Sequence, residues 1–337
     1  MTIRFWADRG VDGFRVDVAH SLAKEIAPPY PKYPNYNTES IPEDGTHQLF
    51  DRDELMEIYK EWRKVFNSYD PPKFAVAEAN APVSRRGRYA KEDTLGQAFS
   101  FELLGTPWEA KRYREVISTS LKFAELNKST TTWTLSNHDQ VRHVSKFGLP
   151  TKTNYNKWLL SNGTKPVADY ELGVRRARAA TLMILALPGC TYLYQGEELA
   201  LPEVPDLPES ELADPIWKRT SGKERGRDGC RVSIPWSEAN AHKNFKGLSA
   251  ERQESASDSM LNFYRKAIEL RKELCANEDF EFIDSPKNSI AFKRSNGWTV
   301  ITNFGPNPVE LPAGQLLISS APLISGKLPG DATAWLK

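Results

Sequence analysis

The chain has little of several features that would place a protein in a class at once. It holds three cysteines, Cys190, Cys230 and Cys275, an odd number at spacings unlike those of a metal site. We therefore expect free thiols, as in a reducing cytosol. No segment approaches the roughly 18 apolar residues of a membrane helix, and the stretch MTIRFWADRG has no signal-peptide core. If Met1 is the natural start, a cytoplasmic protein without a membrane partner follows.

Net charge is almost absent as well. The 45 Lys and Arg residues balance 44 Asp and Glu residues, which leaves a formal charge of +1. No global field therefore draws the chain to nucleic acid or to anionic lipid. Neutral polar substrates fit this balance. Nine Trp and twelve Tyr residues suit the stacking of sugars, and they suit a large core equally well.

Apolar periodicity predicts an α/β protein with a small β domain after it. Long helical and short strand patterns alternate, and a polar, Pro-rich loop covers about residues 27–50. A second long loop covers about residues 198–256, and short alternating runs then predict an antiparallel β domain over residues 277–337. The expected strands are 13–19, 73–79, 97–103, 131–137 and 190–195, and the expected helices are 3–9, 51–69, 109–125, 173–187 and 257–274, the last with Ser257 or Asp258 as N-cap.

The stretch GFRVDVAH, residues 13–20, is the strongest local signal. Asp17 ends a predicted strand, where barrel and open-sheet enzymes place their chemistry. Arg15 lies two residues earlier and points to the same face, so it can keep Asp17 ionised by lowering its pKa. A salt bridge that caps a core strand explains an isolated R-x-D equally well.

Two further acids favour the catalytic interpretation. Glu78 and Asp139 also end predicted strands, and a parallel sheet brings such residues to one rim. Hard metal ions require more oxygen ligands than three and would not tolerate Arg15 beside Asp17. Glycosyl transfer with retention needs a carboxylate nucleophile and a second carboxyl group as general acid/base. Glu78 stands in an apolar strand near other acids, so we expect its pKa to be raised.

The sequence then resembles a known family. GFRVDVAH, AVAEA and LSNHDQVR look like three consecutive signature regions of glycoside hydrolase family 13, the α-amylase family. The stretches LYQGEELALPEV and GRDGCRVSIPW are similar to its α-glucosidase and oligo-1,6-glucosidase branch. The resemblance covers most of the chain, and it implies a (β/α)8 TIM barrel followed by a C-terminal antiparallel β domain.

The resemblance also implies residue roles. Asp17 matches the nucleophile, Glu78 the general acid/base and Asp139 the third acid, which holds sugar hydroxyls. The implied activity is that of a retaining α-glucosidase that removes terminal α-linked glucose from maltose-type or isomaltose-type oligosaccharides through a covalent glucosyl-Asp intermediate, with no cofactor or metal. The implied substrate-binding residues are Arg15, His138, Arg142, Arg227 and, on the leaving-group side, His20.

The resemblance departs from the family at the front of the chain. Residues 1–9 match the helix before the fourth barrel strand, so residues 1–276 would supply strands 4–8 only, and residues 277–337 the β domain. Five strands cannot close a barrel of eight. We therefore expect an N-terminally truncated α-glucosidase that is inactive, or nearly so, as this 337-residue chain.

Two other functions stay open from the sequence. One is a transglucosylase or isomerase that uses the same acids on sucrose, maltose or trehalose. The other is a relative without catalysis that acts as an interaction module, against which the intact Asp17, Glu78 and Asp139 argue. The preference for α-1,4 or α-1,6 linkages, the oligomeric state and the calcium requirement of a longer protein are not decided by this sequence.

Overall fold

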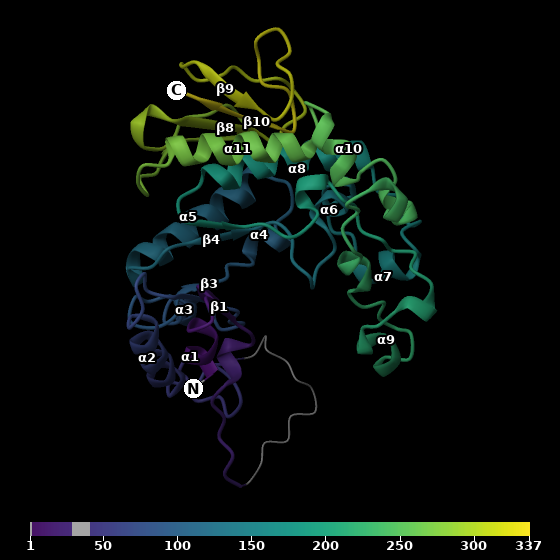
Figure 1. Cartoon of the computed structure of the whole chain (residues 1–337). Coiled ribbons are helices and arrows are strands. Elements are labelled where there is room, and N and C mark those ends of the chain that lie inside the picture. Colours follow the sequence, from purple (N-terminus) through teal and green to yellow (C-terminus); the bar gives the residue numbers. More distant parts are fainter. Residues whose placement is uncertain (1, 29–40) are drawn as a thin grey trace. The chain divides into compact units, whose positions relative to one another are not determined.

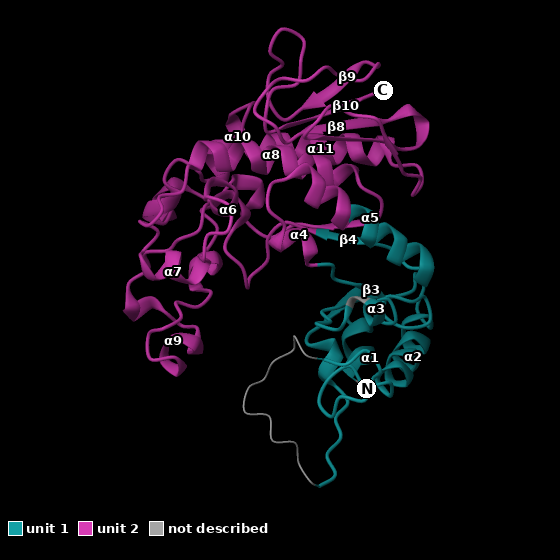
Figure 2. Ribbon diagram, turned by 180° about the vertical axis from the view of Figure 1, so that it is seen from behind, with its two compact units in different colours: residues 1–100, 117–133 teal, residues 101–116, 134–337 magenta. Residues whose placement is uncertain are grey.

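A computed structural model describes residues 2–28 and 41–337 of the chain. It divides into two compact units, shown in Figure 2: unit 1 is Met1–Ser100 with Ile117–Trp133, and unit 2 is Phe101–Val116 with Thr134–Lys337. The chain passes between the units after Ser100, within helix α5 (Ala110–Asn127) and within strand β4 (Thr132–Thr134). The predicted boundary after residue 276 separates a barrel domain from a β domain, whereas the two units are defined by compactness alone. The boundary therefore stays a prediction. Residues 29–40 of the predicted polar loop lie outside the described residues.

Unit 1 contains a parallel sheet with the order β1-β2-β3. Its strands are β1 (Gly13–Val16), β2 (Phe74–Ala77) and β3 (Gly96–Ala98). In the register of β1 and β2, Gly13 pairs with Phe74 and Val16 with Ala77. The residues that follow the two strands, Asp17 and Glu78, are therefore neighbours across the sheet, as a parallel arrangement of strand ends predicts.

The core of unit 1 forms where helix α2 (Leu55–Phe66) covers the sheet. The period of the apolar residues places Leu55, Tyr59 and Phe66 on one face, and all three are fully buried. Burial of side chains of this size contributes about 1.5–3 kcal/mol each. Phe14 of β1 stacks on Phe66 with ring centroids 5.8 Å apart, which fixes the strand that leads to Asp17. The remaining helices of the unit are α1 (Thr2–Ala7) and α3 (Val83–Arg86).

Unit 2 is organised around helix α8 (Tyr170–Ala186). Asp169 caps its first turn by accepting a hydrogen bond from the backbone N–H of Leu172, and the run from Ala179 onward is buried. Pro188 follows the helix and prevents its continuation. The other elements of this part are α4 (Glu102–Gly105), α6 (His143–Gly148), α7 (Tyr155–Leu160), β5 (Cys190–Tyr192), α9 (Pro215–Arg219), α10 (Ala250–Ser255) and α11 (Met260–Leu274).

The C-terminal antiparallel sheet is confirmed. Its order is β6-β7-β8-β10-β9, and its strands are β6 (Glu281–Ile283), β7 (Ser289–Lys293), β8 (Thr299–Asn303), β9 (Leu316–Ser319) and β10 (Ala332–Leu336). Strand β10 runs along α8 (Figure 1). Thr333 and Trp335 donate side-chain hydrogen bonds to the carbonyls of Ala179 and Leu182, at 2.8 and 3.0 Å.

Several boundaries differ from the sequence-based expectation. The third strand ends at Ala98, and residues expected to extend it form the start of α4. Helix α11 begins at Met260, because Ser259 and not Ser257 or Asp258 accepts the capping hydrogen bond, from the N–H of Asn262. The long loop contains α9 and α10, whereas α6 and α7 were not expected at all.

The mixed α/β class with a C-terminal antiparallel sheet is thus confirmed, while the assignment of the parallel strands to part of a barrel stays a prediction. The three cysteines are free thiols, as expected. Within residues 2–28 and 41–337, no helix has both the length and the apolar content that a membrane span requires.

Candidate active site

Unit 1 places Asp17 and Glu78 at the ends of adjacent parallel strands, and Arg15 connects them. One guanidinium nitrogen of Arg15 lies 2.6 Å from Asp17 Oδ1, and the other lies 3.2 Å from Glu78 Oε2. The same Glu78 oxygen accepts a hydrogen bond from the N–H of Val18, at 3.0 Å. Arg15 therefore does more than cap a strand, because it links two carboxylates 61 positions apart in the sequence.

The surroundings of this pair shift the pKa of Glu78. Partial burial raises the pKa of Glu78, and the hydrogen bond and negative charge of Asp17 raise it further. The Val18 N–H and the Arg15 guanidinium oppose this shift, and the net direction is upward. A carboxyl group with a raised pKa next to an ion-paired carboxylate is the arrangement that an acid and nucleophile pair requires.

The backbone directly after Asp17 is strained. Val18 has φ 46° and ψ 44°, a left-handed conformation that β-branched residues rarely adopt. The short helix η1 (Ala19–Ser21) follows, and its His20 is buried, with Nδ1 accepting a hydrogen bond from the N–H of Asn80. Burial lowers the pKa of His20, which favours the neutral ring. Its contact with the leaving group stays a prediction, and its observed role is to tie two strand ends together.

Unit 2 contains Asp139, which two arginines hold. Arg227 Nη1 lies 2.7 Å and Arg231 Nη2 3.0 Å from Asp139 Oδ1. His138 contributes a third contact, with Nε2 3.5 Å from Asp139 Oδ2. The backbone is fixed too, because Asn137 Oδ1 accepts a hydrogen bond from the Asp139 N–H. We call this group of Asp139, Arg227 and Arg231 the Asp139 clamp.

A buried carboxylate anchors the clamp from behind. Asp214 has a side chain only 1% exposed, and its Oδ2 lies 2.5 Å from Arg227 Nε. The Arg227 guanidinium lowers the pKa of Asp214 and is in turn held charged by it. Asp214 Oδ1 also accepts the N–H of Ile216 and so caps helix α9. One carboxylate therefore positions both the clamp and the start of that helix.

Arg142 lies behind the clamp instead of in an open pocket. It is almost completely buried, and its guanidinium donates to the carbonyls of Gln195 and Cys230 at 2.8 Å each. Its N–H donates to Glu203 Oε2. The implied contact of Arg142 with substrate stays a prediction, and these bonds give it a supporting role within unit 2.

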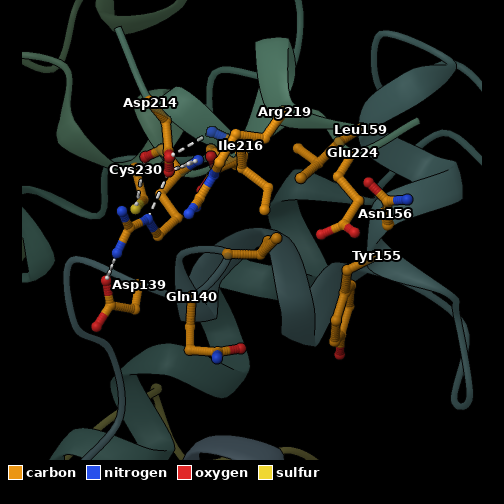
Figure 3. Close-up of a pocket in the computed structure, with 14 residues that line it drawn as sticks. Asp139, Gln140, Tyr155, Asn156, Leu159, Asp214, Ile216, Arg219, Glu224 and Cys230 are labelled. Atoms are coloured by element: carbon orange, nitrogen blue, oxygen red, sulfur yellow. Dashed lines mark hydrogen bonds and ion pairs between the residues drawn. The ribbon is translucent and has the colours of Figure 1, made fainter. Parts of the chain in front are cut away.

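A cavity of about 390 Å³ lies beside the clamp. Figure 3 shows Asp139, Asp214 and Cys230 on one side of it and Tyr155, Asn156 and Glu224 on the other. Burial raises the pKa of the Cys230 thiol to about 12.

Glu203 forms part of the cavity wall and packs against Gly229. Burial raises the pKa of Glu203 to about 7. A Cβ on Gly229 would stand 2.3 Å from Glu203 Oε1 and 2.4 Å from the carbonyl oxygen of Val204. Only glycine fits there, between the two arginines of the clamp in the chain.

A buried acid and histidine lie below the loop that carries Asp139. Glu197 Oε1 and His143 Nδ1 are 3.9 Å apart, and His143 in turn contacts the Ser136 hydroxyl at 2.8 Å. Burial raises the pKa of Glu197 to about 8 and lowers that of His143 to about 3, so both are uncharged at neutral pH. Ser136 directly precedes the NHD motif, so this network supports its backbone.

Sequence reasoning missed some of these residues. Arg231 stands in the quoted run GRDGCRVSIPW, and the helical turn η5 (Asp228–Arg231) places it one turn after Arg227. That spacing was a signal that could have found it. Glu203 stands in the quoted stretch LYQGEELALPEV, which was a comparable signal, whereas Asp214 stands outside the quoted stretches and offered none. Among the described residues, no group of three His, Cys, Asp or Glu side chains is arranged to hold a metal ion.

A family comparison now decides the classification. The model of the family described as "Alpha amylase, catalytic domain" matches residues 1–278 of the chain. The chain belongs to this α-amylase family. The resemblance noted in the sequence is therefore confirmed, and unit 1 together with most of unit 2 falls inside the matched range.

Named relatives within the family are glucosidases. The chain is 30% identical to a probable alpha-glucosidase of Rhizobium meliloti over 87% of its own length and 54% of the relative's. It is 26% identical to an alpha-glucosidase of Candida albicans, over 84% of this chain and 55% of that protein, and 26% identical to the probable oligo-1,6-glucosidase 2 of Bacillus subtilis, over 80% and 52%. The chain thus spans about half the length of these relatives.

Solved structures of the family share the fold. An isomaltulose synthase of Erwinia rhapontici, solved as a mutant with sucrose, has a TM-score of 0.75 at 19% identity, over 99% of this chain and 66% of that one. The alpha-glucosyl transfer enzyme XgtA has a TM-score of 0.71 at 23% identity, with the same shares covered. At sequence identities this low, the structural similarity shows a shared fold and not a shared function.

Proposed function

We propose that the chain carries the catalytic groups of a retaining α-glucosidase that removes terminal α-linked glucose from maltose-type or isomaltose-type oligosaccharides. The observation that supports this most is the bridge from Arg15 to both Asp17 and Glu78 at adjacent strand ends. Retaining glycosidases need two carboxyl groups that are close together but in different protonation states. The family and the glucosidase relatives point to the same chemistry.

Each acid then has a defined step. Asp17, ionised beside Arg15, attacks the anomeric carbon and forms a covalent glucosyl ester, while Glu78 donates its proton to the leaving glycosidic oxygen. Water next attacks the same carbon, Glu78 takes a proton from that water, and Asp17 leaves as the free carboxylate. Two displacements retain the α configuration. The raised pKa of Glu78 suits its two roles, because it holds a proton in the first step and regains one in the second.

The Asp139 clamp is proposed to bind the sugar. Asp139 accepts hydrogen bonds from glucose hydroxyls, and His138 beside it supplies a further polar contact. Arg227 and Arg231 fix the direction of the Asp139 side chain, which is a preorganised electrostatic contribution to the transition state. His20 and Arg142 are proposed to hold backbone in place.

Hydrolysis is proposed over isomerisation. The named relatives that align with four fifths or more of the chain are an alpha-glucosidase, a probable alpha-glucosidase and a probable oligo-1,6-glucosidase. The sucrose-acting neighbour named above is similar in fold only. Incubation with sucrose and maltose separates the two functions, because a hydrolase releases free glucose, whereas an isomerase yields a rearranged disaccharide.

We also infer that the 337-residue chain by itself turns over slowly. The Asp17 side chain is 70% exposed, and β1 stands at the end of its sheet. Water around a nucleophile weakens the electrostatic interactions that stabilise the transition state. A turnover number below about 1 s⁻¹ is expected, since typical enzymes range from about 1 to 10³ s⁻¹. Robust hydrolysis of p-nitrophenyl α-glucoside would overturn this inference.

Trapping the intermediate tests the proposed chemistry even at a slow rate. The chain is incubated with 5-fluoro-α-glucosyl fluoride, whose ring fluorine slows hydrolysis of the covalent ester, and its peptides are analysed by mass spectrometry. We expect one fluoroglucosyl group on the peptide that contains Asp17, and none in the Asp17→Asn variant. Label on another residue, or no label after prolonged incubation, would overturn the assignment and favour a protein without catalysis.

A further inference from the structure

A second cavity in unit 2 contains none of the residues given a role above. Its volume is about 450 Å³, within the range of about 300–1,000 Å³ typical of small-molecule sites. All of its lining residues belong to unit 2, and they come from the end of α4, the start of α5, α6, the turn before α7, and α8. Tyr155 is the one residue that also lines the cavity beside the Asp139 clamp.

Positive side chains outnumber negative ones in the lining of this cavity. Its charged residues are Arg112, Lys146, Lys152, Arg176 and a single acid, Glu109. The two arginines are compensated from outside the lining, because Arg112 pairs with Glu115 at 3.1 Å and Arg176 with Asp331 at 3.0 Å. Neither lysine forms an ion pair with a described carboxylate. The cavity therefore offers a net positive charge to a ligand.

Lys146 of α6 is the buried member of this charged group. The residue is only 9% exposed, and its Nζ donates to the carbonyl of Leu104, which leaves two of its three N–H groups without a described acceptor. Burial lowers the pKa of Lys146 to about 8, because the ammonium group loses hydration there. An anion in the cavity pairs with this ammonium and offsets the cost of its burial.

The rest of the lining suits a polyhydroxy compound better than a bare ion. Trp108 is fixed in place, because its Nε1 donates to Asp331 at 2.6 Å and its ring contacts Phe147, with centroids 5.4 Å apart. Tyr155 and Glu109 add a hydroxyl and a carboxylate to the lining. A water molecule occupies about 30 Å³ of the liquid, so the cavity has room for far more than one phosphate ion.

We propose that this cavity binds a sugar phosphate, with the phosphate group held by Lys146 and Lys152 and the sugar ring packed on Trp108. An ammonium group is a compact charge with three donors, and lysine is a common phosphate ligand for that reason. The C–H face of a sugar ring packs on an aromatic side chain, while Tyr155 and Glu109 are able to hydrogen-bond its hydroxyl groups. The site shares no residue with the proposed catalytic groups, so the proposal stands or falls independently of the proposed function.

Binding calorimetry on the 337-residue chain tests the site with glucose 6-phosphate, and with glucose and inorganic phosphate as its two parts. We expect glucose 6-phosphate to bind with a Kd below about 1 mM, and about ten-fold more tightly than either part alone. Lys152→Gln should weaken this binding about five-fold, and Lys146→Met about ten-fold, because each removes a charge that pairs with the phosphate. Glu109→Gln should strengthen it about two-fold, because a repulsive charge is removed.

The variants differ in what they risk for folding. Lys146 is buried, so the melting temperature of Lys146→Met without ligand is measured first. Lys152 is exposed, and its replacement tests the site without disturbing the interior. The result with Lys152→Gln therefore decides the proposal even if Lys146→Met is unstable.

Two variants control for general charge effects and for binding elsewhere. Lys157→Gln removes an exposed positive charge of α7 that lines neither cavity, and Arg219→Gln removes one that lines only the cavity beside the clamp. Both are expected to keep the affinity for glucose 6-phosphate within about two-fold of the parent.

Three results would overturn the proposal. If Lys152→Gln binds glucose 6-phosphate like the parent, or if Lys157→Gln weakens binding equally, the lysines of the cavity do not hold the phosphate. If Arg219→Gln loses binding and Lys152→Gln does not, the phosphate lies in the cavity beside the clamp. If inorganic phosphate binds as tightly as glucose 6-phosphate, the ligand is a free anion and not a sugar phosphate.

Discussion

Arg227 Nη1 lies 2.7 Å from Asp139 Oδ1, although 88 positions separate the two residues in the chain. The contact joins the NHD motif to the long loop, and the second bond of Arg227, to buried Asp214, makes it part of the interior as well. The guanidinium therefore has two roles that mutagenesis can separate.

Loss of Arg227 should destabilise unit 2 more than loss of Arg231. Arg227→Met leaves the buried Asp214 carboxylate without its cation, and we expect a loss of about 2 kcal/mol in the free energy of unfolding. Arg231→Met removes the same charge but leaves Asp214 paired, so we expect a loss below about 1 kcal/mol. Urea denaturation of both variants measures the difference. Equal losses would contradict the anchoring role of Asp214.

Removal of the Arg15 charge should change the titration of Glu78. The guanidinium lowers the pKa of Glu78 against the effect of burial, so Arg15→Met should raise that pKa further. Carbon-13 NMR of the Glu78 carboxyl group across pH measures it, with Lys64→Met on the exposed face of α2 as the control for a lost positive charge. A pKa that falls, or that shifts equally in the control, would contradict the bridge.

Glu197 should make stability depend on pH in a defined window. Its pKa is about 8 in the folded chain and about 4.5 in the unfolded chain, so between these values the folded state holds a proton that the unfolded state has lost. The contribution of Glu197 to stability is therefore greatest at low pH and decreases as pH rises to about 8, by roughly 3 kcal/mol between pH 5 and pH 8.

Glu197→Gln isolates this effect. A glutamine stays neutral, so the melting temperature of the variant should decrease less between pH 5 and pH 8 than that of the parent. The surface variant Glu211→Gln is the control and should show the same decrease as the parent. The comparison with the parent is needed because His143 opposes the trend: its pKa of about 3 makes stability rise with pH up to about 6.5. Parallel pH profiles for parent and Glu197→Gln would show that the acid is not buried in its neutral form.

The left-handed backbone at Val18 should destabilise the chain, and replacement of Val18 by asparagine should relieve this strain. Val18 is 40% exposed, so its replacement loses little burial, and asparagine adopts a positive φ more readily than a β-branched residue. We expect Val18→Asn to raise the free energy of unfolding by about 0.5–1 kcal/mol. Val167→Asn, at an exposed site without positive φ, should change it by less than 0.5 kcal/mol. A destabilised Val18→Asn would argue against strain at this position.

Strand ends and long helices could be predicted from the sequence because their signals are local. Asp17 and Glu78 follow apolar runs, and the register of β1 and β2 then makes them neighbours. Helix α8 was recognisable by its length and by Pro188 after it. The short helix α9 was not, because its boundary depends on Asp214, whose partner Arg227 stands 13 positions later. The clamp required tertiary structure, since loop residues carry no periodicity that shows which of them meet.

Gly229 limits how this enzyme family member can change over evolutionary time. Because Glu203 and the Val204 carbonyl leave no space for a side chain at that position, the turn with both clamp arginines requires glycine there. Libraries at residues 227–231 should therefore yield mainly unstable chains.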